Sequence, residues 1–315
     1  MSHGSKLASR RFARIIVPLV VIIAGPIALL QAEPTAVARD VAMSVAAGTP
    51  AKPVGPATKP PGTASKPADP ATNPPGTATK AVYFRTLPPG AKLPSGAYCA
   101  KLVNSSPLPE DKAANKPYNQ RKGRHVGAKF LAYDGPQAQR LAKRVNGDFT
   151  GTTIDILRWA ACKWGINQDI VFAQAAVESW WQQDTLGGWT DSSACQPGRL
   201  LGQQRKPGQC PVTYGILQNT YEPGGTPAGW PAISRSTAMN ADAAYAVWRS
   251  CFDGYETWLN TMPRGSQYHK GDVWGCVGRW FSGQWRNPPA LAYIAQVKKY
   301  LREKIWLTPD FQQGH

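Results

Sequence analysis

Residues 152–181 read TTIDILRWAACKWGINQDIVFAQAAVESWW, and this stretch decides the fold. Apolar residues recur in it every three or four positions, which is the period of an amphipathic helix. Thr152 or Thr153 can cap a first helix that runs through Trp164, and Gly165 provides its stop. The sequence therefore predicts a helix from this threonine pair to Trp164.

Three more helices follow from the same reasoning. Asn167 can cap a second helix that ends near the two tryptophans at 180 and 181. A third is predicted from Asn240 to about Leu259, where apolar side chains again stand at helical spacing. The last begins at Pro288-Pro289, because proline suits the first turn of a helix. The fold class expected is mainly α.

The segment between the second and third helices, residues 184–239, is long, polar and rich in Gly and Pro. A loop of that length inside a compact domain is usually functional or partly stranded. We therefore expect a small β or loop insertion, with a short hairpin closed by Cys195 and Cys210.

All six cysteines lie beyond residue 80, and an even count in an exported chain predicts three disulfides. Two pairs join sequence neighbours across loops, and the third follows by elimination. The predicted pairs are Cys195–Cys210, Cys251–Cys276 and Cys99–Cys162. Because no two cysteines have C-x-x-C spacing and the four histidines are scattered, we expect no metal and no other cofactor.

The N-terminal third divides into three parts. Residues 1–38 contain a basic start and a short apolar run, which is typical of an export signal cleaved after Ala32 or Ala38, or of an uncleaved membrane anchor. Residues 39–80 are a Pro/Ala/Thr-rich linker, in which PATKPPGTASK recurs as PATNPPGTATK, and we expect them to be disordered. Residues 81–133 are predicted to be a loop-rich lead-in to a compact domain at 134–315. The protein is thus expected to be exported: periplasmic, in the cell wall, secreted or anchored.

Net charge points to an anionic partner. The chain carries +17, and from residue 81 onward 27 Lys and Arg stand against 16 Asp and Glu. A polyanionic wall or an anionic membrane surface fits this charge, whereas a solvated basic surface that only aids solubility is the alternative. Nucleic acid is not expected, because the chain is exported and has no dense basic block with interleaved aromatics.

Glu178 is the acid with the clearest chemical potential. It stands at the edge of the buried stripe of the second helix and near its C-terminal end, where the helix dipole disfavours negative charge. Partial burial and the dipole both favour a protonated carboxyl group, which is what glycosidic bond cleavage needs as its general acid. The alternative is an ordinary boundary Glu that caps the helix or forms a salt bridge.

Two motifs add to this hypothesis. Ala176-Val177-Glu178-Ser179, followed by Tyr214-Gly215-Ile216-Leu217-Gln218-Asn219, resembles the signature of the lysozyme-like soluble lytic transglycosylases. The segment Tyr293-Ile294-Ala295-Gln296-Val297 is similar to the final Tyr-x-x-x-Val helix of that family. The family's Ala-Tyr-Asn-Ala-Gly-like motif is replaced here by Gly278-Arg279-Trp280-Phe281-Ser282-Gly283, so the roles of its Tyr and Asn do not transfer.

The resemblance implies a lysozyme-like catalytic domain at 134–315 that cleaves the MurNAc-GlcNAc bond of peptidoglycan, with Glu178 as general acid and base. It also implies that Ser179 supports the site, that Tyr293 positions Glu178 or the sugar, and that Gln218 contacts the sugar beside Gly215 and Ile216.

Aromatic side chains that can stack on sugar rings add four cleft candidates. They are Trp181, Trp189, Tyr214 and Trp280. Two alternatives stay open: a non-catalytic module that binds wall glycan or chitin, and a lysozyme-like hydrolase that acts on another glycan.

Overall fold

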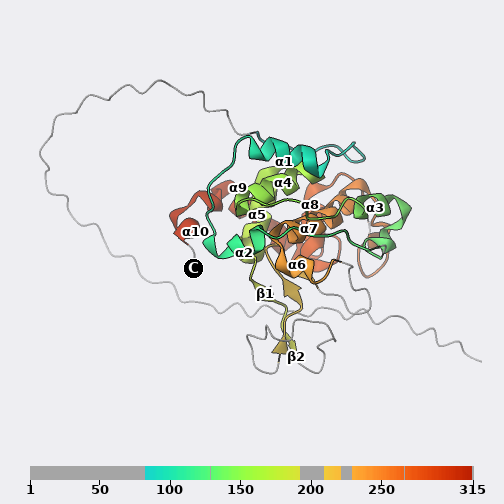
Figure 1. Cartoon of the computed structure of the whole chain (residues 1–315). Helices are drawn as coiled ribbons and strands as arrows, with labels where there is room; N and C mark the ends of the chain where they lie inside the picture. Colours follow the sequence, from blue (N-terminus) through green and yellow to red (C-terminus); the bar gives the residue numbers. More distant parts are fainter. Residues whose placement is uncertain (1–81, 128, 192–208, 221–228, 266, 314–315) are drawn as a thin grey trace, which may run out of the picture. The chain divides into compact units, whose positions relative to one another are not determined.

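The computed structural model describes residues 82–127, 129–191, 209–220, 229–265 and 267–313 (Figure 1). These residues form a mainly α structure with a few two-residue strands. The predicted export signal and linker lie outside the described residues, and so does Cys195. Within the described part, no helix has the length and apolarity needed to cross a membrane.

Helix α4 (Thr153–Trp164) is the centre of the core. It packs against α1 (Gly96–Asn104), α5 (Gln168–Ser179) and α7 (Thr237–Asp253), as Figure 1 shows. Every residue of α4 except Ile154 is buried, so the helix is enclosed on all sides and not only on one apolar face. Its predicted ends are confirmed: Thr152 accepts a hydrogen bond from the backbone N–H of Asp155, and Gly165 has a left-handed φ of 58°.

The charged residues of α4 are paired because an isolated buried charge is costly. Arg158 lies 2.9 Å from Asp155 within the helix, and Lys163 lies 2.7 Å from Asp242 of α7. Asp242 also accepts hydrogen bonds from the Nε1–H of Trp164 and from the backbone N–H groups of residues 146 and 147, each at 2.8 Å. This cluster, the Asp242 hub, joins α4, α7 and the loop before α4.

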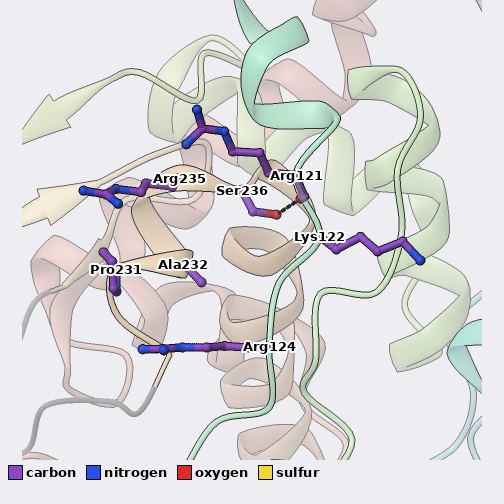
Figure 2. Close-up of a pocket in the computed structure, with 7 residues that line it drawn as sticks. All are labelled: Arg121, Lys122, Arg124, Pro231, Ala232, Arg235 and Ser236. Carbon is purple, nitrogen blue, oxygen red and sulfur yellow. Dashed lines mark hydrogen bonds between the residues drawn. The ribbon is translucent and has the colours of Figure 1, made fainter.

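The other predicted helices agree with the structure in part. Asn167 caps α5, and α9 (Pro288–Glu303) begins at the proline pair as predicted. The prediction for the third helix was wrong at both ends: α7 begins three residues earlier, because Ser236 caps it, and Gly254 ends it with a φ of 92°. The hydroxyl of Ser236 also donates to the carbonyl oxygen of Arg121 at 2.5 Å, as Figure 2 shows.

Two of the longer helices were not predicted. Helix α1 lies inside the lead-in that we expected to be loop-rich, with Ser95 as its cap, and α8 (Val273–Ser282) is capped by Asp272. The remaining helical elements are short. They are η1 (Ala113–Asn115), α2 (Lys116–Asn119), η2 (Ala132–Asp134), α3 (Gly135–Ala142), α6 (Ala232–Arg235), η5 (Thr257–Asn260), η6 (Ile305–Leu307) and α10 (Pro309–Gln313).

The predicted β insertion consists of two small antiparallel sheets. One has the order β1-β4-β5 and the other pairs β2 with β3, with Thr190 opposite Cys210. The strands are β1 (Leu186–Gly187), β2 (Thr190–Asp191), β3 (Gln209–Cys210), β4 (Thr213–Tyr214) and β5 (Asn219–Thr220). In Figure 1 the labelled strands lie on one side of the helices, beside α6.

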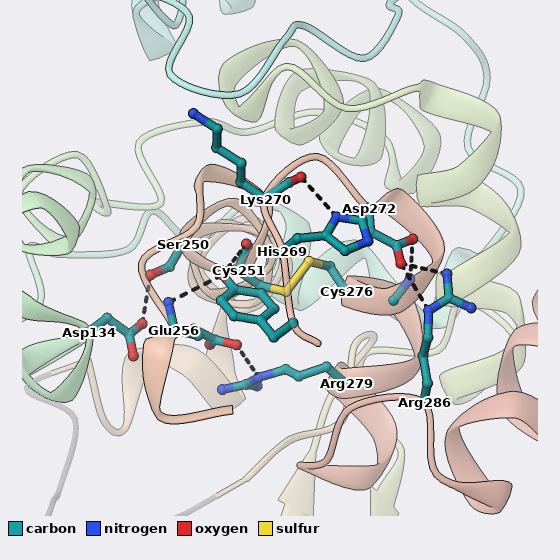
Figure 3. The surroundings of a disulfide bond; sticks show 12 residues. Asp134, Ser250, Cys251, Glu256, His269, Lys270, Asp272, Cys276, Arg279 and Arg286 are labelled. Carbon is teal, nitrogen blue, oxygen red and sulfur yellow. Dashed lines mark hydrogen bonds and ion pairs between the residues drawn. A yellow bond between two sulfur atoms is a disulfide. The ribbon is translucent and has the colours of Figure 1, made fainter. Parts of the chain in front are cut away.

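Two of the predicted disulfides are present. Cys99–Cys162 ties α1 to α4, and Cys251–Cys276 ties α7 to α8. Cys210 is disulfide-bonded as well. Figure 3 shows that an ion pair stands beside the second disulfide: Arg279 of α8 lies 2.6 Å from the fully buried Glu256, which follows α7. Disulfide and ion pair together fix α8 against the end of α7.

Candidate active site

Glu178 is the penultimate residue of α5, and the chain reverses directly after it. Trp180 ends the helix with a left-handed φ of 58°, and Trp181 follows with a φ of 62°. Left-handed backbone is unusual for such bulky residues and requires support from surrounding packing. Trp181 supplies that support, because it is fully buried and its indole N–H donates to the carbonyl oxygen of Phe172 at 2.9 Å.

The carboxyl group of Glu178 accepts two hydrogen bonds from residues distant in sequence. The hydroxyl of Tyr293, on α9, donates to Oε1, and the indole of Trp280, on α8, provides a second hydrogen bond. Helix α9 packs against both α5 and α8, so the three side chains meet where these helices come together. The predicted proximity of Tyr293 and Glu178 is confirmed.

The pKa of Glu178 is raised from its ordinary value of 4.5 to about 7. Burial is the largest cause, because a low-dielectric environment disfavours the carboxylate, and the two hydrogen bonds oppose it only in part. Glu178 as a whole is still half-buried, so solvent reaches the residue. At neutral pH this residue can therefore both give and take a proton.

The tyrosines beside Glu178 stay protonated. Burial and the neighbouring carboxyl group raise the pKa of Tyr293 well above its usual range, and the same two causes raise the pKa of Tyr245. Gln174, one turn before Glu178 on α5, is buried and partly offsets this rise in the pKa of Tyr293 through its side chain. Sequence patterns did not single out Gln174 or Tyr245, although the i, i+4 spacing of Gln174 and Glu178 places both on one helix face.

Ser179 contacts the backbone of the turn that contains Ile216. Its hydroxyl donates to the carbonyl oxygen of Ile216 at 2.9 Å and accepts from the backbone N–H of Gln182 at 3.1 Å. The turn that contains Ile216 needs glycine at 215, where φ is 80° and a Cβ would lie 2.3 Å from Nδ2 of Asn240. The two predicted motifs are therefore joined by this Ser179–Ile216 hydrogen bond.

Gln218 has a structural task in this turn. Its side-chain nitrogen donates to the carbonyl oxygens of Thr185 and Gly215 at 3.2 and 2.8 Å, and its side-chain oxygen accepts from the Thr213 hydroxyl at 2.7 Å. The side chain thus closes the turn between β4 and β5. Contact with a sugar, as the resemblance implies, is open to the side-chain oxygen, which accepts one of these hydrogen bonds and has a second lone pair.

The predicted cleft aromatics differ in exposure. Trp280 and Trp189 are half-buried, whereas Trp181 and Tyr214 are core residues with 0% and 1% exposure, which contradicts a stacking role for either ring. The hydroxyl of Tyr214 donates to the carbonyl oxygen of Pro211 at 3.1 Å. The side chain of Ile216 is fully buried too, so it also belongs to the core.

One aromatic residue at the site was not predicted. Phe281 is 39% exposed, and its ring stacks on that of Tyr293 with the centroids 4.9 Å apart and the planes 6° from parallel. Its neighbour Trp280 hydrogen-bonds to Glu178. The signal was that Phe281 directly follows the cleft candidate Trp280 in the departure from the family motif, where the sequence analysis gave Phe281 no role.

The pKa of Glu178 is set by burial, Tyr293 and Trp280, and no described acidic residue is among the groups that shift it. Across the same residues, no three His, Cys, Asp or Glu side chains gather as metal ligands would. The described site therefore offers one acid with hydrogen-bonding support, arranged for proton transfer.

Comparisons with models of protein families, with curated proteins and with solved structures found no match for this chain.

Proposed function

We propose that this protein cleaves a cell-wall glycan and that Glu178 protonates the oxygen of the bond that breaks. The observation that carries the proposal is the buried carboxyl group of Glu178, whose pKa of about 7 keeps a transferable proton at neutral pH. A module that only binds glycan needs no such acid. Phe281 and Trp280 offer aromatic surface beside it on which a sugar ring can stack.

Among glycan-cleaving enzymes, we propose a lytic transglycosylase of lysozyme-like fold that acts on peptidoglycan. Glycosidases that use water usually need a second carboxylate about 5–10 Å from the first. Because no described carboxylate is among the groups that shift the pKa of Glu178, we take a hydroxyl of the sugar itself as the attacking group. Glu178 first donates its proton to the leaving oxygen and then, as carboxylate, takes the proton of the attacking hydroxyl. The hydrogen bonds from Tyr293 and Trp280 stabilise that carboxylate.

An exported location belongs to the same proposal. Cys99–Cys162 and Cys251–Cys276 support it, because structural disulfides form and persist in oxidising compartments. The basic surface is suited to an anionic wall.

The product distinguishes the proposed reaction from hydrolysis. We expect the full-length protein to release peptidoglycan fragments that end in a ring-closed anhydro sugar. Such ends resist borohydride and are lighter by one water than the reducing ends that hydrolysis leaves, so mass spectrometry before and after borohydride treatment separates them. Fragments that all take up hydride indicate a hydrolase, and the absence of any fragment indicates a binding module.

The pH dependence follows from the general-acid role. The reactive form is protonated Glu178, so kcat/KM should fall as pH rises through about 7. Tyr293→Phe removes a hydrogen bond that stabilises the carboxylate, which raises the pKa of Glu178 and moves this alkaline limb to higher pH. The dependence of kcat/KM on pH, measured for the wild type and for Tyr293→Phe, checks this prediction.

Tyr300→Phe is the matched control for this experiment. Tyr300 stands two turns further along α9 and packs on Trp180, so its loss should leave the limb in place. A limb that moves to lower pH in Tyr293→Phe would contradict the assigned hydrogen bond.

A further inference from the structure

An open hollow of about 430 Å³, away from the contacts of Glu178, is lined by four cationic residues. Arg121, Lys122 and Arg124 come from the segment after α2, and Arg235 ends α6. Figure 2 shows the three arginine side chains extending to the same side of this segment, while Lys122 turns away from them. We call this hollow the arginine pocket.

The arginine pocket carries charge that the described residues do not neutralise. Lys122 forms an exposed ion pair with Asp148, at 2.8 Å. Within the described ranges, none of the three arginines forms an ion pair with an acidic side chain. Arg124 donates to the carbonyl oxygen of Trp230, which fixes its direction but not its charge. Three guanidinium groups around one hollow repel one another, and a polyanionic ligand would relieve that repulsion.

The backbone that carries the arginines is held rigidly. The N–H of Gly123 donates to the carbonyl oxygen of Gly147 at 2.8 Å, and the hydroxyl of Ser236 holds the carbonyl of Arg121. A Cβ at position 123 would lie 2.6 Å from the sulfur of Met239, so only glycine allows the segment to lie this close to α7. A fixed backbone lowers the ordering cost of binding.

We propose that the arginine pocket binds phosphate groups of a linear polymer. Guanidinium groups recognise phosphate through paired N–H donors, which lysine cannot supply. The hollow is open, so a polymer can cross it, and three cations can engage successive anionic groups. Pro231 and Ala232 supply the apolar part of its lining, and no large apolar side chain is present there to insert into a membrane.

The pocket is linked to the turn beside Ser179 through α6, but it shares no functional group with the site around Glu178. The side chain of Gln183 donates to the carbonyl oxygens of Ile233 and Ser234 in α6 and accepts from the N–H of Ile216 in the turn beside Ser179. Arg121 and Arg235 contact none of the residues assigned to proton transfer. Polymer binding and glycan cleavage can therefore be removed separately.

Binding of long-chain inorganic polyphosphate to the full-length protein, measured calorimetrically, tests the proposal. The double variant Arg121→Gln/Arg235→Gln should bind at least about tenfold more weakly, because two charge-assisted contacts are lost. The matched control is Arg140→Gln/Arg302→Gln, which removes the same charge from exposed positions on α3 and α9 and should stay within about twofold of the wild type.

Three outcomes would overturn it. An equal loss in the control variant shows that net charge alone binds the polymer, and equal binding of polyglutamate of the same length removes the preference for phosphate. Binding that needs vesicles of anionic phospholipid assigns the pocket to a membrane. Glu178→Gln should bind polyphosphate normally, and the arginine variant should cleave peptidoglycan normally, so failure of one proposal leaves the other testable.

Discussion

Replacement of Glu178 by Gln should reduce glycan cleavage by about two to four orders of magnitude. Gln keeps the volume and the acceptor oxygen that Tyr293 contacts, but it has no proton to give. The fold should be retained in this variant, because the side chain keeps its size and the site loses a charge that is costly to bury. Release of soluble fragments from peptidoglycan measures activity, and cosedimentation with the insoluble glycan measures binding, which should persist.

Glu222→Gln is the matched control for this variant. Glu222 is the acid that follows the second motif in the sequence, and it lies outside the described residues. If Glu178 acts alone, Glu222→Gln should retain activity within a few-fold. Retained activity in Glu178→Gln would disprove the general-acid assignment, whereas a comparable loss in both variants would indicate a two-carboxylate hydrolase.

Replacement of Asp242 by Asn should lower the free energy of unfolding by about 3–5 kcal/mol. Asp242 neutralises Lys163 at 2.7 Å, and both side chains are at most 2% exposed. Burial already lowers the pKa of Lys163, and Asp242 opposes that shift, so its loss leaves a buried cation without a counter-charge. Lys163 still lies over the ring of Trp159, 4.7 Å from its centroid, but that contact does not replace a full negative charge.

Asp148→Asn provides the comparison for the Asp242 hub. It breaks the ion pair with Lys122, in which both side chains are about 60% exposed, and such pairs contribute at most about 1 kcal/mol. Urea unfolding at neutral pH gives both free energies. Similar losses in the two variants would mean that the buried pair contributes no more than a surface pair.

The sequence predicted the elements whose signals are local. Caps at Thr152 and Asn167, and the proline pair that opens α9, depend on neighbouring residues only, and all three hold in the structure. Helix α1 was missed because its nine residues are short and only Cys99 and Val103 are buried, which gives too few apolar positions for a period to emerge.

Glu178 and Tyr293 could be chosen as site residues from the sequence, but the aromatic residues packed around them could not. Glu178 could be chosen from its place at the edge of an apolar helix. That Trp181 turns into the core depends on the left-handed backbone at 180 and 181, which no residue preference at those positions indicates. The stacking of Phe281 on Tyr293 depends on how α8 packs against α9, and packing of that kind has no sequence signature.

The hydrogen bond between Tyr293 and Glu178 spans 115 positions of the chain, and this separation affects when the site forms. Contacts between distant segments are made late, because closing a long loop costs entropy before the contact repays it. Until α9 docks on α5, Glu178 is solvated like any surface carboxyl group and holds no proton at neutral pH. If the proposed function holds, a nascent or partly folded chain thus carries Glu178 without the raised pKa, and the docking of α9 provides it.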